Sequence, residues 1–168
     1  MLATYGTPER LSPSALHCSQ DLASTPEAAF TLLCEVEKWP VWLSCLRTAR
    51  RLDPDTPFGL GSDVALRAKM SDEEELYEVD QYLEGHIVSL VGAYSVRRRI
   101  DFRVERKNGR AKLVVRLDYP SYGGVVGALI DRMTARRRLD RALVDSLVHF
   151  KGLVEFQRTA PDELLADF

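Results

Sequence analysis

The chain has 168 residues, 45% of them hydrophobic, which is enough for one compact domain to build a core without disulfides or metal ions. Its 23 Lys and Arg residues nearly balance 25 Asp and Glu residues, and the formal net charge of -2 gives no reason to expect nucleic acid or an anionic membrane as a partner. The N-terminal residues have no signal-peptide pattern, and no later stretch approaches the ~20 apolar residues of a membrane span, so we expect a cytoplasmic protein.

The composition also gives no sign of a cofactor. The cysteines are Cys18, Cys34 and Cys45. They are odd in number and lack paired CxxC spacing, so we expect reduced, buried thiols. The three histidines are far apart in the sequence and form neither HxH nor HExxH. "FGLGS" (58–62) lacks the lysine of a phosphate-binding loop and is expected to be a turn. We therefore expect no cofactor and no metal.

The hydrophobic pattern predicts a strand at 15–23, then two short helices, six further strands and one long helix. Ser24 and Glu27 stand at capping-box spacing around Pro26, which places the start of the first helix there. The later strands are expected at 46–52, 62–70, 74–83, 86–94, 96–106 and 111–119, and the long helix from 124 to about 157. We expect one domain at 14–157, between a flexible N-terminal segment (1–13) and an acidic tail (158–168).

The dipeptide Asn108-Gly109 is the strongest local signal, because it favours a two-residue type I′ hairpin turn. If Lys107 faces Arg110, one face of the hairpin carries three pairs of opposite charge and the other carries apolar pairs. The charged pairs are Glu105 with Lys112, Asp101 with Arg116, and Arg99 with Asp118. The apolar pairs are Val104 with Leu113, Phe102 with Val115, and Ile100 with Leu117. We therefore predict one exposed face, whose ion pairs specify register, and one core face.

Two features suggest polar groups on the inner side of this sheet. The same register sets Arg98 opposite Tyr119 on the core face, where these side chains either reach solvent at the rim or mark the polar end of a cavity. One face of the long helix combines apolar residues with small ones and a single charge, Arg132. The small residues either allow close packing against the sheet or leave room for a ligand.

Three charged runs have simpler interpretations than ligand sites. "SDEEELYEVD" (71–80) lacks calcium-loop spacing and is expected to be a solvated hairpin with one charged face. "VRRR" (96–99) and "ARRRLDR" (135–141) are diluted by nearby acidic residues, so an RNA or ribosome contact is kept only as a minor alternative.

This order of elements resembles the START-like (SRPBCC, Bet v 1-type) superfamily, and within it the polyketide cyclase/dehydrase-like proteins. The resemblance rests on "LASTPEAAFTLLCEVEKWPVWLSCL" (22–46), "GLGSDVAL" (59–66) and the segment 114–155 that begins "VVRLDYPSYGG". It implies an α+β helix-grip fold, in which a curved antiparallel β-sheet wraps around a long C-terminal helix and two short helices follow the first strand. Both tryptophans would then lie in the second short helix, with Pro40 in its first turn, and close one end of the sheet.

The resemblance also implies a central apolar cavity that binds a small hydrophobic molecule such as a lipid or polyketide. By their positions on the expected inner faces, the candidate ligand-binding residues are Trp39, Trp42, Met70, Tyr77, Arg98, Phe102, Tyr119 and Arg132. Apolar walls supply affinity and a few polar groups fix orientation.

Three functions remain open from the sequence. The first is sequestration or delivery of a hydrophobic ligand by a monomer or homodimer. The second is a metal-free cyclase/dehydratase, in which Arg98 stabilises an enolate-like oxygen and Tyr119 or Tyr77 transfers a proton. The third is a protein or RNA partner on the arginines at 136–138.

Overall fold

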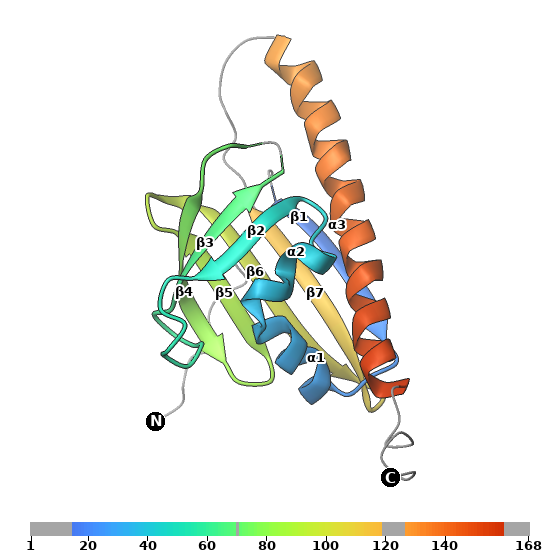
Figure 1. Ribbon diagram of the computed structural model, residues 1–168. Coiled ribbons are helices and arrows are strands. Elements are labelled where there is room, and N and C mark those ends of the chain that lie inside the picture. Colours follow the sequence, from blue (N-terminus) through green and yellow to red (C-terminus); the bar gives the residue numbers. More distant parts are fainter. Residues whose placement is uncertain (1–14, 70, 119–126, 160–168) are drawn as a thin grey trace, which may run out of the picture.

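The computed structural model describes residues 15–69, 71–118 and 127–159, with the backbone alone at 95–97, 127–135 and 158–159. Within these residues the chain forms a seven-stranded antiparallel sheet and a long C-terminal helix (Figure 1). The strands are β1 (Ala15–Leu22), β2 (Leu46–Arg51), β3 (Asp63–Ala68), β4 (Glu75–Leu83), β5 (Ile87–Gly92), β6 (Ser95–Lys107) and β7 (Arg110–Asp118). The helices are α1 (Pro26–Cys34), the 3₁₀ turn η1 (Val36–Lys38), α2 (Trp39–Trp42) and α3 (Gly127–Thr159).

The sheet has the strand order β1-β7-β6-β5-β4-β3-β2 and curls around the short helices and α3, so the predicted helix-grip arrangement is confirmed (Figure 1). The helix α3 packs beside β1 and contacts α2. The predicted tail at 158–168 begins inside α3 as far as Thr159, and the rest of it, like the segment 1–13, lies outside the described residues.

The predicted hairpin register is confirmed at every pair from Lys107 and Arg110 to Arg99 and Asp118. Asn108 and Gly109 both have positive φ, 51° and 77°, as a type I′ turn requires. The inner face of β6 and β7 is apolar, and Phe102 and Leu113 are fully buried on it.

The charged face of this hairpin differs from the prediction in two ways. Its ion pairs run along the strands, from Arg99 to Asp101 (2.8 Å) and from Arg116 to Asp118 (3.1 Å), because residues two apart on one face are also neighbours. Arg99 reaches a third strand as well, at Asp80 (2.7 Å). The face is also less exposed than predicted, since Asp101 is only 4% exposed. The opposite charges are therefore paired within a partly buried network.

The start of α1 is one residue later than predicted. Thr25 is the N-cap, and its hydroxyl accepts a hydrogen bond from the Ala28 backbone N–H (3.3 Å). Ser24 is buried, and its carbonyl accepts a hydrogen bond from the Ala111 N–H (2.8 Å), which holds it to β7. Ser24 therefore joins the sheet and does not form the predicted capping box with Glu27.

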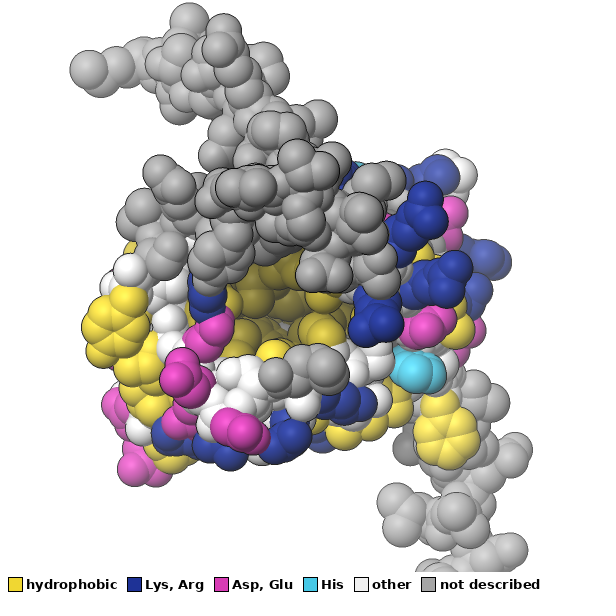
Figure 2. All heavy atoms as spheres, turned by 90° about the horizontal axis from the view of Figure 1, so that it is seen from above, with side chains coloured by type: hydrophobic (Ala, Val, Ile, Leu, Met, Phe, Trp, Pro, Cys, Tyr) yellow, Lys and Arg dark blue, Asp and Glu magenta, His cyan; other side chains and the backbone are white. Residues whose placement is uncertain are grey.

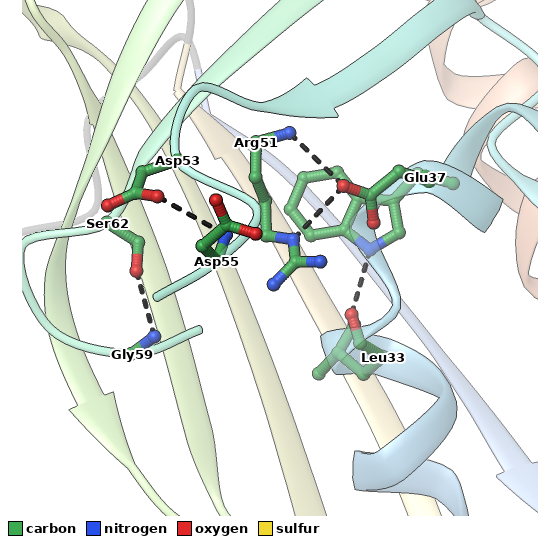
Figure 3. A network of polar contacts seen from close by, with 8 residues as sticks. Leu33, Glu37, Arg51, Asp53, Asp55, Gly59 and Ser62 are labelled. Atoms are coloured by element: carbon green, nitrogen blue, oxygen red, sulfur yellow. Dashed lines mark hydrogen bonds and ion pairs between the residues drawn. The ribbon is translucent and has the colours of Figure 1, made fainter. Parts of the chain in front are cut away.

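The second short helix begins at Trp39 with Pro40 in its first turn, as predicted. The segment before it is fixed by Glu37, whose carboxylate accepts hydrogen bonds from the backbone N–H (3.3 Å) and the Nε (3.0 Å) of Arg51 (Figure 3). The predicted turn at 58–62 is present, and the Gly59 N–H donates to the Ser62 hydroxyl there (3.0 Å; Figure 3).

The two tryptophans are both fully buried but differ in their polar contacts. The Trp39 indole N–H donates to the Leu33 carbonyl at the end of α1 (2.8 Å; Figure 3). The Trp42 indole nitrogen is buried and has no hydrogen-bond partner among the described residues. The Trp42 ring makes edge contacts with Phe150 of α3 (4.8 Å between centroids) and Phe102 of β6 (6.0 Å). Both side chains therefore join the short helices to the core, and only Trp39 does so with a hydrogen bond.

This difference predicts unequal costs for the same substitution. Trp39→Phe should lower the free energy of unfolding by about 1–2 kcal/mol more than Trp42→Phe, because only the first leaves a buried carbonyl without its donor. Chemical denaturation of both variants measures the difference. Equal losses would mean that the Leu33 carbonyl finds another partner, and a larger loss for Trp42→Phe would contradict the assignment.

Candidate ligand-binding cavity

A cavity of about 40 Å³ lies between the inner face of the sheet, α2 and α3. Its described walls are Trp39, Leu43, Cys45, Leu46, Leu66, Ile100, Phe102, Val115, Leu117, Leu139 and Leu143. Seen from the end of the molecule where α3 begins, the space-filling view shows a hollow with an apolar interior and charged side chains on its rim (Figure 2).

Strand alternation and helix periodicity explain why these walls are apolar. Ile100 and Phe102 of β6 lie opposite Leu117 and Val115 of β7, and all four side chains point inward. Leu139 and Leu143 are four residues apart and lie on one face of α3. The site is therefore assembled from the residues that the period-2 and period-3.6 patterns place on the core side.

The segment that follows α2 is held to α3 beside the cavity by small polar residues. The Ser44 backbone N–H donates to the Ser146 hydroxyl (2.9 Å), and the Ser44 hydroxyl donates to the Ala142 carbonyl (2.9 Å). Ser146 is fully buried. In this part of α3 the small residues thus serve close packing, which was one of the two alternatives from the sequence.

A polar cluster stands at one edge of the apolar walls. Arg98 is two residues before Ile100 on the same face of β6, and its guanidinium forms an ion pair with Glu75 of β4. The Tyr77 hydroxyl donates to the other oxygen of the same carboxylate (3.0 Å). Gly92 of β5 lies directly opposite Tyr77. Because Gly92 has no side chain, β5 adds no bulk next to Tyr77 at this position.

The electrostatics of this cluster oppose ionisation of the tyrosine. Burial, followed by the adjacent Glu75 carboxylate, raises the pKa of Tyr77 well above its ordinary value. Arg98 lowers the pKa by less than these two effects raise it. Tyr77 therefore stays protonated at neutral pH and serves as a hydrogen-bond donor. The nearby Arg98 therefore does not bring the pKa of Tyr77 down to its ordinary value.

The structure brings together four of the residues predicted to bind ligand. Trp39 and Phe102 line the cavity, and Tyr77 and Arg98 lie in the polar cluster. Trp42 packs against Phe150 and is not among the described wall residues. The other three predicted residues are not tested. Met70 and Tyr119 lie outside the described residues, and only the backbone of Arg132 is described.

Glu75 is the participant that sequence reasoning missed. It belongs to the run 71–80, which we expected to be a solvated hairpin with one charged face. Two other acids of this run do face partners on the surface, since Glu74 pairs with Arg50 (2.8 Å) and Asp80 with Arg99. Glu75 shares the period-2 face of Tyr77, and that spacing was the signal that could have identified it.

The other sequence-predicted features are placed as follows. Among the described residues, no three His, Cys, Asp or Glu side chains are grouped so that they could hold a metal ion.

The three cysteines are free thiols and partly buried, where we had expected full burial. Burial raises the pKa of Cys34 to about 11, which makes it a poor nucleophile at neutral pH. In the described parts of the chain, no helix is long and apolar enough to cross a membrane.

The arginine runs do not form one basic stripe. In the first run, Arg98 and Arg99 point to opposite faces of β6 and pair with Glu75 and Asp80 respectively. In the second, Arg136, Arg137 and Arg138 are exposed on α3. Among the arginines of these two runs whose side chains are described, the exposed ones lie on α3.

Comparison with known proteins identifies the fold. No family model matches the chain, and no curated protein is similar to it at a significant level. Solved structures do match. The KanY protein superposes with a TM-score of 0.67 at 16% identity, over 84% of this chain and 97% of that one. The Zhui aromatase/cyclase from Streptomyces sp. R1128 gives 0.66 at 15% identity, over 87% and 96%.

A START superfamily protein from Mycobacterium smegmatis superposes with a TM-score of 0.58 at 16% identity, over 85% of this chain and 98% of that one. Together these matches show that the chain has the START-like (SRPBCC) helix-grip fold that the sequence resemblance implied. At such identities the likeness establishes architecture, and function has to be argued from the cavity itself.

Proposed function

We propose that this protein binds a small hydrophobic molecule in the cavity between the sheet, α2 and α3, and sequesters or delivers it. The observation that supports this proposal is the combination of wholly apolar walls with one cluster of polar groups at their edge. Such a site takes its affinity from apolar burial and orients its ligand with a few hydrogen bonds.

The size of the cavity limits how the ligand can sit. A water molecule needs at least about 10–15 Å³, whereas benzene occupies an engineered cavity of about 150 Å³. At about 40 Å³, the enclosed space takes only part of a ring system. Ile100, Leu117 and Leu139 are only partly buried. We therefore propose that the ligand enters through the hollow in Figure 2 and that these three side chains change rotamer to admit it.

The cluster favours binding over the cyclase/dehydratase alternative. A proton-transferring tyrosine needs a pKa near the working pH, and that of Tyr77 is shifted the other way. The charge of Arg98 is already paired with Glu75, which reduces what it offers to a developing enolate. Arg98, Glu75 and Tyr77 are thus better suited to orienting a ligand.

Native mass spectrometry of protein purified without detergent tests the proposal, followed by solvent extraction of any molecule that leaves on denaturation. We expect either a retained apolar molecule or, for protein free of ligand, saturable binding of naphthalene. In the second case, amide NMR shifts should concentrate on β6, β7 and α2. If no molecule is retained and naphthalene causes no saturable shifts, the proposal is wrong.

A further inference from the structure

We propose that Glu75 sets the charge selectivity of the cavity, so that it accepts neutral apolar ligands bearing a hydroxyl or carbonyl group and disfavours carboxylates. The inference rests on the proposed function and adds the class of ligand. It follows from how the three polar side chains at the edge of the cavity are paired.

The first step is the charge of the cluster. Arg98 alone would be an attractive partner for a carboxylate, because its planar guanidinium binds carboxylates through two parallel hydrogen bonds. Glu75 already occupies one of its nitrogens, Nη1, in an ion pair. With Tyr77 protonated, the cluster of one cation, one anion and one phenol carries no net charge.

The second step is the hydrogen-bonding capacity that remains. Both oxygens of Glu75 are engaged, Oε1 by Arg98 and Oε2 by Tyr77, yet each carboxylate oxygen can accept a further hydrogen bond. The guanidinium has five N–H donors in all. A hydroxyl can donate to Glu75 and accept from Arg98, and a carbonyl can accept from Arg98. A ligand carboxylate would instead place a second anion beside Glu75.

The third step is that the cluster lies where a ligand's polar end would be. Arg98 follows the inward face of β6 directly from Ile100 and Phe102, which line the apolar walls. The side chains of Arg98 and Glu75 are 32% and 42% exposed, so neither is closed off from a ligand by the rest of the protein. A ligand whose apolar ring lies among the wall residues therefore has its polar substituent within reach of this charge-neutral pair. A negatively charged substituent would be repelled there by the carboxylate of Glu75.

Three probes that share one ring system test this inference: naphthalene, 2-naphthol and 2-naphthoate, titrated calorimetrically at pH 7. Naphthol is neutral and naphthoate is an anion at this pH. We expect wild-type protein to bind naphthol about tenfold or more tightly than naphthoate. Naphthoate binding as tightly as naphthol would overturn the inference.

The variant Glu75→Gln removes the negative charge and keeps the shape and an acceptor oxygen for Arg98. We expect naphthoate to bind about tenfold more tightly to it than to wild type, while naphthol affinity changes little. The matched control is Glu78→Gln, which removes the same charge from the outer, exposed face of the same strand. Equal gains in both variants would show a general effect of net charge and would overturn the role of Glu75.

Arg98→Gln provides an independent test with the opposite sign, which holds even if Glu75→Gln fails to fold. It leaves Glu75 without its cation, so the preference for naphthol over naphthoate should grow, and an unchanged or smaller preference would overturn the inference. Naphthalene separates the two proposals. If naphthalene binds and the charge preference is absent, only the role of Glu75 is wrong; if none of the probes binds, the proposed function fails as well.

Discussion

Replacing Phe102 by alanine should lower the free energy of unfolding by about 3–5 kcal/mol, measured by chemical denaturation. Phe102 is fully buried in the middle of β6. Its ring lies 5.3 Å from that of Trp39 and 6.0 Å from that of Trp42, both between centroids. Truncation removes the apolar contacts of the ring with both tryptophans and enlarges a cavity that its neighbours already leave partly empty.

Phe156→Ala is the control for the loss of a phenyl ring, because Phe156 lies on α3 and is 73% exposed. Its effect should stay within about 0.5 kcal/mol. A loss of less than about 1 kcal/mol for Phe102→Ala would mean that Trp39 and Trp42 move into the space left by the ring. Their packing against Phe102 would then not be rigid. Naphthalene should restore part of the lost stability, since a ligand that binds only the folded state stabilises it.

The sequence predicts the fold well where one local signal determines many residues. The Asn108-Gly109 turn specifies the register of β6 and β7, and the predicted pairs are present from Lys107 with Arg110 to Arg99 with Asp118. The next pair, Arg98 with Tyr119, lies outside the described residues. Two-residue turns permit so few backbone geometries that this prediction needs no tertiary information. The register also placed Phe102 on the inner face, where it lines the cavity.

Predictions were less accurate where several local arrangements were possible. Ser24 and Thr25 can both cap a helix, and the choice depends on a contact with the distant Ala111, whose N–H holds the Ser24 carbonyl. The ion pairs of Arg99 illustrate the same limit. Cross-strand register makes Asp118 its neighbour, but Asp80 and Asp101 are nearer once three strands are assembled.

The candidate site was only half predictable for a related reason. Strand periodicity identifies Tyr77 and Arg98 as inward residues, yet Glu75 looked like one more acid in a charged run. Its ion-pair partner, Arg98, comes from β6, about twenty residues further along the chain, and only the assembled sheet shows this pairing. The shift in the Tyr77 pKa depends on the same assembly, because it combines burial with the position of Glu75.

Replacing Leu117 by phenylalanine should reduce naphthalene affinity at least about tenfold, because the larger side chain would occupy the space that the ligand needs. Leu117 of β7 lines the cavity opposite Ile100 and is only partly buried, so a ring at this position can extend into the hollow. The unfolding free energy should fall by no more than the roughly 1–3 kcal/mol typical of overpacking. Calorimetric titration and chemical denaturation of one protein preparation separate these two effects.

The control is Leu83→Phe, the same substitution at the end of β4, where the side chain is 56% exposed. It should leave naphthalene affinity unchanged. If Leu117→Phe also left naphthalene affinity unchanged, naphthalene would have to bind outside the cavity. The alternative place is the surface crevice between β1 and α3, lined by His17, Arg136, Arg137 and Asp140. Charged groups there would favour naphthoate over naphthalene, so the relative affinity of these two probes distinguishes that crevice from the apolar cavity.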